Sequence, residues 1–221
     1  MNVVARVNDT NMDVSDVPSA DSRRDPRFTV LLKAAKLVAP AGEFVCVIRD
    51  ASVSGLRVQL FHPLPPGKYF DLELPTGDRH RVEVVWERDG QAGLRFESRI
   101  KLASLMTDCG RFHKRSIRLA VQLPALVSRL GETIGVVIHN LSQSGARIEC
   151  PKHLAIGESL RLEADLLPVL QAHVRWRNGT DYGVVFDQTF RFDELACLVA
   201  ALQGSGKDGK AGQRLRSMHF R

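Results

Sequence analysis

The feature that most constrains how this chain can fold is an internal repeat with an offset of 90 residues. The offset carries the polar turn NLSQSG, residues 140–145, onto DASVSG, residues 50–55. It continues without a gap and superposes further identical pairs, among them Gly157 on Gly67, Trp176 on Trp86, Gly183 on Gly93 and Phe186 on Phe96. Self-similarity at a fixed period indicates two copies of one domain, and a chain of 221 residues has room for both.

Each copy contains six short segments of strand-like composition, separated by Pro, Gly or charged turns, and then one helical segment. The strand segments are 27–39, 43–50, 55–60, 68–75, 80–89 and 92–98 in the first copy, and 118–130, 133–140, 145–150, 158–164, 170–177 and 182–187 in the second. Closely spaced short strands of this kind predict an all-β fold, either an antiparallel barrel or a sandwich. We expect helices at 98–106, with Ser98 as a possible N-cap, and at 193–202, beginning with Asp193.

Apolar and polar residues alternate clearly in one of these strands. In residues 172–177, Ala172, Val174 and Trp176 fall on one face and the polar residues fall on the other. A period of two predicts one buried face and one solvated face. We therefore expect Trp176 and its counterpart Trp86 to pack in the two cores rather than to stack on a ligand.

The ends of the chain read as tails around two domains, which we place at 22–108 and 109–202. Residues 1–21 are acidic and residues 203–221 are basic and Gly-rich, and both segments lack the apolar surface that offsets the entropy of ordering. The second tail matches G-x-x-x-x-G-K but continues with Ala211, where a phosphate-binding loop requires Ser or Thr. The match also follows a helix rather than a strand, so we expect no nucleotide hydrolysis there.

Composition favours a soluble protein that is not exported. Hydrophobic and charged contents of 44% and 25% are typical of globular domains, and no apolar run approaches the ~20 residues of a spanning helix. The N-terminal residues lack a signal-peptide core, so we expect a cytoplasmic protein with reduced thiols.

Net charge +6 favours an anionic partner. The histidines show no metal-ligand spacing and no nucleophile motif is present, so we expect neither an enzyme nor a bound cofactor. The four cysteines, which form no CxxC pair, are Cys46, Cys109, Cys150 and Cys197.

A basic cluster precedes each polar turn. The gap from Arg27 to Asp50 is 23 residues, and the gap from Arg118 to Asn140 is 22. Two basic residues four apart are common by chance, whereas composition predicts only about 0.1 chance matches to [DN]-x-S-x-x-G in a chain of this kind. Two such turns at equivalent places, each behind a basic cluster, are therefore a specific signal. The clusters comprise Arg23, Arg24 and Arg27 in the first copy and Lys114, Arg115 and Arg118 in the second.

This combination resembles the PilZ family, bacterial six-stranded β-barrel modules that bind cyclic di-GMP. The family signature is R-x-x-x-R in an N-terminal loop followed by [D/N]-x-S-x-x-G at the barrel surface. The resemblance covers roughly residues 22–202 and implies two tandem antiparallel barrels, each closed by a C-terminal helix. The first copy matches at Arg23, Arg27, Asp50, Ser52 and Gly55, with Arg24 beside them; the second matches at Arg118, Asn140, Ser142 and Gly145 but has Lys114 in place of the first Arg.

The resemblance implies one cyclic di-GMP site per copy, and the residue types suit that ligand. Guanidinium groups donate paired hydrogen bonds to phosphate oxygens and to guanine O6 and N7. A carboxylate at Asp50 can accept from both N1–H and the 2-amino group of guanine. Ser52 can add a small donor or acceptor, and Gly55 permits a positive φ and a close approach of the backbone.

Two readings from other classes remain open. The first is a degenerate scaffold that binds proteins with little or no nucleotide, which gains weight in the second copy because Lys114 lacks the planar fork of Arg and Asn140 offers guanine a single acceptor. The second is a general nucleic-acid binder. It is not favoured, because such proteins interleave aromatic with basic residues and the segment SRRDPR, residues 22–27, contains no aromatic residue.

The same reasoning gives three further expectations. The first site should be the tighter one, because its motif is complete. The protein should prefer cyclic di-GMP to cyclic di-AMP, through Asp50. Ligand binding at the second site should order the linker 107–118 and change the relative orientation of the two domains, which would pass the signal to a downstream protein. Membrane insertion is not expected.

Overall fold

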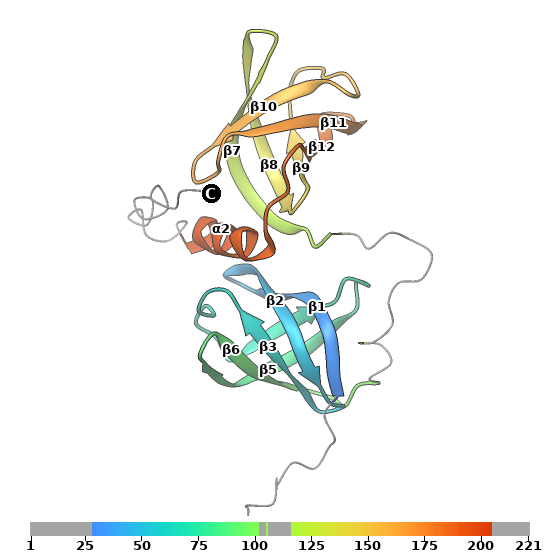
Figure 1. Cartoon of the computed structure of the whole chain (residues 1–221), viewed down its shortest axis with the longest axis vertical. Coiled ribbons are helices and arrows are strands. Elements are labelled where there is room, and N and C mark those ends of the chain that lie inside the picture. Colours follow the sequence, from blue (N-terminus) through green and yellow to red (C-terminus); the bar gives the residue numbers. More distant parts are fainter. Residues whose placement is uncertain (1–27, 102–104, 106–115, 205–221) are drawn as a thin grey trace, which may run out of the picture.

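The computed structural model describes residues 28–101, Leu105 and residues 116–204; most of them form two closed antiparallel barrels, and a helix follows the second barrel (Figure 1). The first barrel has the strand order β1-β2-β3-β6-β5-β4, and β4 pairs with β1 to close it. Its strands are β1 (Phe28–Ala39), β2 (Gly42–Ala51), β3 (Gly55–Leu60), β4 (Tyr69–Glu73), β5 (Arg79–Arg88) and β6 (Gln91–Phe96). The six predicted strand segments of the first copy are thus confirmed.

The second barrel repeats this arrangement with the order β10-β11-β12-β9-β8-β7, closed by pairing of β10 with β7. Its strands are β7 (Leu119–Arg129), β8 (Glu132–Ser142), β9 (Gly145–Glu149), β10 (Ser159–Ala164), β11 (Leu170–Asn178) and β12 (Asp181–Phe186). A barrel, rather than an open sandwich, pairs the edges of the sheet and leaves no strand edge exposed.

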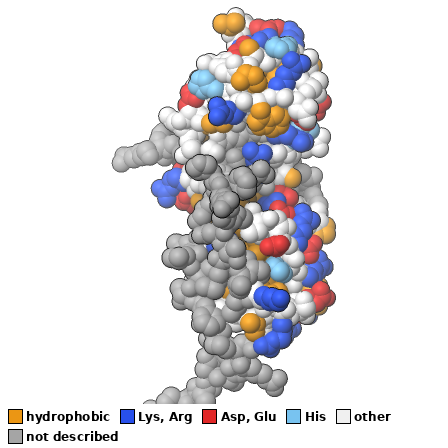
Figure 2. Space-filling model, turned by 90° about the vertical axis from the view of Figure 1, so that its right-hand side faces the viewer, with side chains coloured by type: hydrophobic (Ala, Val, Ile, Leu, Met, Phe, Trp, Pro, Cys, Tyr) orange, Lys and Arg blue, Asp and Glu red, His pale blue; other side chains and the backbone are white. Residues whose placement is uncertain are grey.

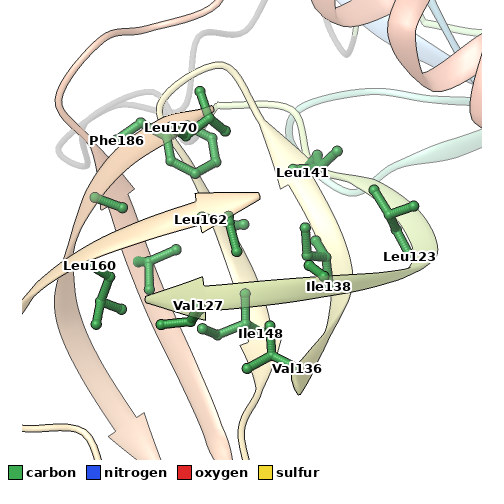
Figure 3. Packing of buried hydrophobic residues seen from close by; sticks show 14 of the residues in the cluster. Leu123, Val127, Val136, Ile138, Leu141, Ile148, Leu160, Leu162, Leu170 and Phe186 are labelled. Carbon is green, nitrogen blue, oxygen red and sulfur yellow. The ribbon is translucent and has the colours of Figure 1, made fainter. Parts of the chain in front are cut away.

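Each barrel has its own core, made of inward-facing side chains from every strand. Figure 3 shows part of the core of the second barrel. In the second barrel, Ile138, Ile148 and Leu162 come from three different strands and are at most 1% exposed. Burial of such side chains contributes roughly 1.5–3 kcal/mol each, which makes the aliphatic filling the main source of stability.

The helix predicted at 193–202, at the end of the second copy, is confirmed, and it starts one residue earlier than predicted. Helix α2 (Phe192–Gly204) begins one residue before Asp193, and the backbone N–H of Arg191 donates to Glu194 Oε2 at 2.9 Å. The helix expected in the first copy does not begin at Ser98, because residues 98–101 are not helical. Leu105 is helical and fully buried, while the rest of that segment lies outside the described residues.

Helix α2 lies between the two barrels and packs on both (Figure 1). Val45, on β2 of the first barrel, is 1% exposed and belongs to the core cluster of the second barrel. The rings of Phe61 and Phe192 meet edge to face at 5.5 Å, and Cys197 Sγ donates to the carbonyl of Phe61 at 3.3 Å. The two copies are therefore joined by an apolar contact as well as by the chain.

The two tryptophans do not pack in the cores, so that prediction was wrong. Trp176 is 37% exposed and Trp86 is half-buried. A β-bulge shifts the register between Val174 and Trp176 on β11, and another does so between Val84 and Trp86 on β5. One extra residue in a strand turns every later side chain to the opposite face, so the alternation that predicted burial fails at the bulge.

No helix within residues 28–101 and 116–204 has the length and apolar character needed to cross a membrane. In the same part of the chain, Cys46, Cys150 and Cys197 are free thiols, while Cys109 lies outside it.

Candidate ligand site

Two further bulges place the acidic or amide residue of each motif on the outer face of its barrel. Ile48 and Ala51 both point into the first core, although only Arg49 and Asp50 separate them, and the register shifts between Ile48 and Asp50. The second barrel has the same shift between Ile138 and Asn140. Bulges commonly re-aim a side chain beside a functional site, and here they turn Asp50 and Asn140 away from the core.

Strand pairing places these residues in one lateral row on each barrel. The row of the first barrel runs through paired residues Thr29, Asp50, Arg57, Gly93 and Trp86. The row of the second barrel runs through Ala120, Asn140, Arg147, Gly183 and Trp176. The two rows match position by position, and we call them the first and second motif rows.

The glycine in each row makes room for the neighbouring tryptophan. A Cβ atom on Gly93 would overlap Nε1 of Trp86, and a Cβ on Gly183 would overlap Nε1 of Trp176. Each indole therefore lies across its paired glycine on the outside of the barrel. The tryptophans form one end of the motif rows.

An arginine that the sequence analysis did not single out lies at the centre of each row. In the first row the guanidinium of Arg57 holds the Asp50 carboxylate, with Nε and Nη2 both 2.6 Å from Oδ2. Asp50 is 8% exposed, so this pair is partly shielded from water. In the second row Asn140 Oδ1 instead accepts from the backbone N–H of Arg147 at 3.2 Å. The offset of 90 also relates Arg147 to Arg57, so comparing the two copies two residues beyond the motif would have found both.

The two serines hold the turn together in the structure described. Ser52 Oγ donates to the carbonyl of Gly55 at 3.1 Å and accepts from its N–H at 3.2 Å. Ser142 Oγ donates to the carbonyl of Gly145 at 3.0 Å. Both serines are buried, so their hydroxyls fix the β2–β3 and β8–β9 turns. Their contact with a ligand remains a prediction.

The motif glycines are required by close packing of strands rather than by a positive φ. Neither Gly55 nor Gly145 has a positive φ, which corrects that part of the expectation. A Cβ on Gly55 would lie 2.5 Å from the carbonyl oxygen of Leu94, on the neighbouring strand β6. A Cβ on Gly145 would overlap the carbonyl oxygen of Val184 in the same way.

Most of the basic cluster residues lie outside the described part of the chain: Arg23, Arg24, Arg27, Lys114 and Arg115. The strands that follow them are described. Thr29, two residues after Arg27, pairs with Asp50, and Ala120, two residues after Arg118, pairs with Asn140. Arg118 itself is exposed next to the fully buried Leu119. Each cluster therefore leads directly into a motif row.

The second motif row also touches the first barrel. The backbone N–H of Ala120 donates to Oε2 of Glu43 on β2 at 2.8 Å. Its carbonyl accepts from Nε2 of Gln203, on helix α2, at 3.3 Å. Ala120 is thus in contact with the first barrel and α2, and it is paired with Asn140.

Charges of both signs are interspersed over the described surface in Figure 2. On the first barrel many of them are paired, as in the ion pair between Lys36 and Glu73 at 2.7 Å. Partial burial tends to raise the pKa of the Glu73 carboxylate, but the hydrogen bonds and charges of Lys36 and Arg79 together outweigh it and lower this pKa from its ordinary value. Within the described ranges, no cluster of His, Cys, Asp and Glu side chains is suited to hold a metal ion.

A family model described as PilZ domain matches residues 21–107 and 111–204. No curated protein matches the sequence. Similar solved structures include the Borreliella burgdorferi PlzA protein in complex with c-di-GMP, which is 14% identical with a TM-score of 0.32, over 77% of this chain and 86% of that chain. YcgR from Escherichia coli in complex with c-di-GMP is 11% identical with a TM-score of 0.32, over 80% and 87%. The Bacillus subtilis inhibitor of motility MotI/DgrA is 13% identical with a TM-score of 0.34, over 81% and 99%. Only the family model, which spans both barrels, bears on the identity of the chain.

Proposed function

Because the chain belongs to the PilZ domain family, we propose that it is a receptor for cyclic di-GMP with one binding site on each barrel. The observation that carries this proposal is the motif row. Each barrel sets an Asp or Asn and an Arg side by side on its outer face, in register with the strand that follows a basic cluster. A dianionic ligand with two guanine bases suits such a surface, because guanidinium groups bind both phosphates and guanine edges.

In the first site, Arg23, Arg24 and Arg27 would bind the phosphates and stack on the bases, and Asp50 would accept hydrogen bonds from guanine. In the second site the corresponding residues are Lys114, Arg115, Arg118 and Asn140. The ligand is regulatory, so the proposal assigns no catalytic step. We place the receptor in the cytoplasm, with a downstream protein as its target.

Isothermal titration calorimetry with cyclic di-GMP and cyclic di-AMP tests this function. We expect cyclic di-GMP to bind, and to bind far more tightly than cyclic di-AMP. Substitution Asp50→Ala should narrow that preference, whereas Arg27→Ala should weaken both ligands. Equal affinity of the unaltered chain for the two dinucleotides would contradict guanine recognition. No binding of either ligand would favour the scaffold that acts by protein–protein contact alone.

We further propose that the first site is the tighter one, because Lys114 replaces an arginine in the second. Loss of a bidentate charged contact typically costs ~1–3 kcal/mol, or about 5- to 150-fold in affinity. In calorimetry, Arg27→Ala should therefore lose more total affinity than Arg118→Ala. An equal or larger loss for Arg118→Ala would reverse the ranking.

Signal transmission is proposed to run from the second site to the contact between the barrels. Ala120 supports this route, because its N–H is bound by Glu43 of the first barrel, its carbonyl is bound by Gln203 of α2, and it pairs with Asn140. A ligand that moves Arg118 toward the second motif row would displace the start of β7 at Ala120. The hydrogen bonds of Ala120 to Glu43 and Gln203 would then change as well.

Small-angle scattering with and without cyclic di-GMP measures the proposed reorientation. The profile of the unaltered chain should change at saturating ligand, and that of Arg118→Ala should change much less. An unchanged profile for the unaltered chain, with binding verified by calorimetry, would show that the two barrels respond independently.

A further inference from the structure

We propose that Arg147 is an additional ligand-binding residue of the second site, and that its guanidinium donates to a phosphate of the bound dinucleotide. Arg147 lies outside the [D/N]-x-S-x-x-G motif. The inference rests on the proposed function, because it concerns the ligand of the same site.

The first observation is a donor without an acceptor. Arg147 Nε is shielded from solvent and has no hydrogen-bond partner among the described residues. The carboxylate of Asp181 is its ion-pair neighbour, but Oδ1 lies 3.8 Å from Nε, beyond hydrogen-bond distance. A shielded donor of a charged group is costly to leave unpaired. The guanidinium as a whole is therefore short of acceptors, and a phosphate that reaches its exposed outer part would supply one.

The second observation is the contrast with the first barrel. Arg57 occupies the equivalent position, and its guanidinium is committed to Asp50 through two contacts of 2.6 Å. Asn140 cannot form that pair, because it is uncharged and its Oδ1 accepts from the backbone N–H of Arg147. Replacing Asp by Asn therefore leaves the second guanidinium with only a looser ion pair, to Asp181 at 3.8 Å. The second site gains a cation that the first site uses internally.

The third observation is the position of Arg147 within the second motif row. It is paired between Asn140 and Gly183, and the Trp176 indole lies across Gly183 on the same outer face. The side chain of Arg147 is 42% exposed, so its outer part is open to a ligand while Nε is covered. A dinucleotide held at Asn140 by the [D/N]-x-S-x-x-G turn would lie next to this guanidinium. The planar guanidinium of Arg147 can thus supply the paired hydrogen-bond donors that the ammonium group of Lys114 does not offer.

The chain offers a site-specific probe, because it has two tryptophans and each lies in a different motif row. In a Trp86→Phe background, Trp176 fluorescence reports on the second site alone, and calorimetry on the same samples counts the sites. Cyclic di-GMP is titrated into this background, into Arg147→Met and into Arg147→Lys. Arg161→Met is the matched control, since Arg161 is an exposed strand arginine of the same barrel, on β10, that pairs with Glu163.

We expect Arg147→Met to raise the half-saturation concentration at the second site by about tenfold or more, since a charge-assisted hydrogen bond is lost. Arg147→Lys should fall between Arg147→Met and the background, and Arg161→Met should stay within about twofold. Circular dichroism checks that each variant remains folded. Two sites of unchanged affinity in Arg147→Met would overturn the role of Arg147 and leave the receptor function intact. Absence of all cyclic di-GMP binding in the unaltered chain would overturn both proposals.

Discussion

Substitution Gly55→Ala should destabilise the first barrel by overpacking, although it adds only one methyl group. The new Cβ would lie 2.5 Å from the carbonyl oxygen of Leu94, whereas ordinary contact begins at 3.4 Å. Relief requires a shift of roughly 1 Å between two backbones, β3 and β6, and overpacking of this kind costs about 1–3 kcal/mol. The lower entropy of the unfolded Ala chain offsets about 0.4–1 kcal/mol of this cost. The net loss should be about 1–2 kcal/mol, or roughly 2–8 °C in Tm for a protein of this size.

Thermal and urea unfolding followed by circular dichroism measure the change, with Gly135→Ala as the control. Gly135 also lies within a strand, β8, but no atom would lie within 4 Å of its added Cβ. We expect Gly135→Ala to be neutral or slightly stabilising. Unchanged stability of Gly55→Ala, or an equal loss in both variants, would refute the close-approach explanation of the motif glycine.

Three other predictions follow from the described contacts. Burial raises the pKa of the Cys46 thiol to about 12, so iodoacetamide at pH 8 should leave Cys46 unmodified until the protein unfolds, as peptide mass spectrometry would detect. Val45→Lys should separate the barrels and split the calorimetric unfolding transition, whereas Val85→Lys, at a valine 57% exposed on the same barrel, should not. Because its pKa is lowered in the folded state, the Glu73 carboxylate stabilises the fold above pH 4.5 and loses this effect as the pH falls. The difference in urea stability between the unaltered chain and Glu73→Gln should therefore shrink between pH 7 and pH 3.5.

The repeat and the strand pattern predicted two all-β domains of six strands each, because both depend on local composition and on spacing. The choice of a barrel over a sandwich came from the resemblance to the PilZ family. The position of the tryptophans was not predictable in the same way. A period of two places Trp176 with Val174, but the bulge between them reverses the face. A bulge depends on how two strands pair, and one strand read alone does not contain that information.

Of the two features that the motif glycine permits, a positive φ and a close approach of the backbone, only the close approach occurs at Gly55. A glycine after two turn residues suggests a positive φ, whereas Gly55 is needed because Leu94, distant in sequence, lies too close for a side chain. The ion pair between Asp50 and Arg57 was also missed, although the two residues are only seven apart. Strand pairing brings them together, and the repeat at Arg147 was the signal available in the sequence.

The packing of α2 on both barrels had a sequence signal that was not used. Phe44, Val45 and Cys46 are three consecutive apolar residues, whereas a strand with one solvated face would alternate apolar and polar side chains. In the structure all three are buried. Such a run indicates a strand covered on both sides, and the cover here is α2 from the second copy.

This packing makes the two copies unequal despite their matching motif rows. The strand residue paired with Asn140 is held by Glu43 of the other barrel and by Gln203 of α2. A ligand at the proposed second site would therefore act on a strand end that is part of the contact between the barrels. A tighter first site with its own internal ion pair would respond to low ligand concentration, and a weaker second site at the contact would respond only when the concentration rises. Two unequal sites of this kind would let one chain report two ranges of second-messenger concentration, of which only the upper one changes the arrangement of the barrels.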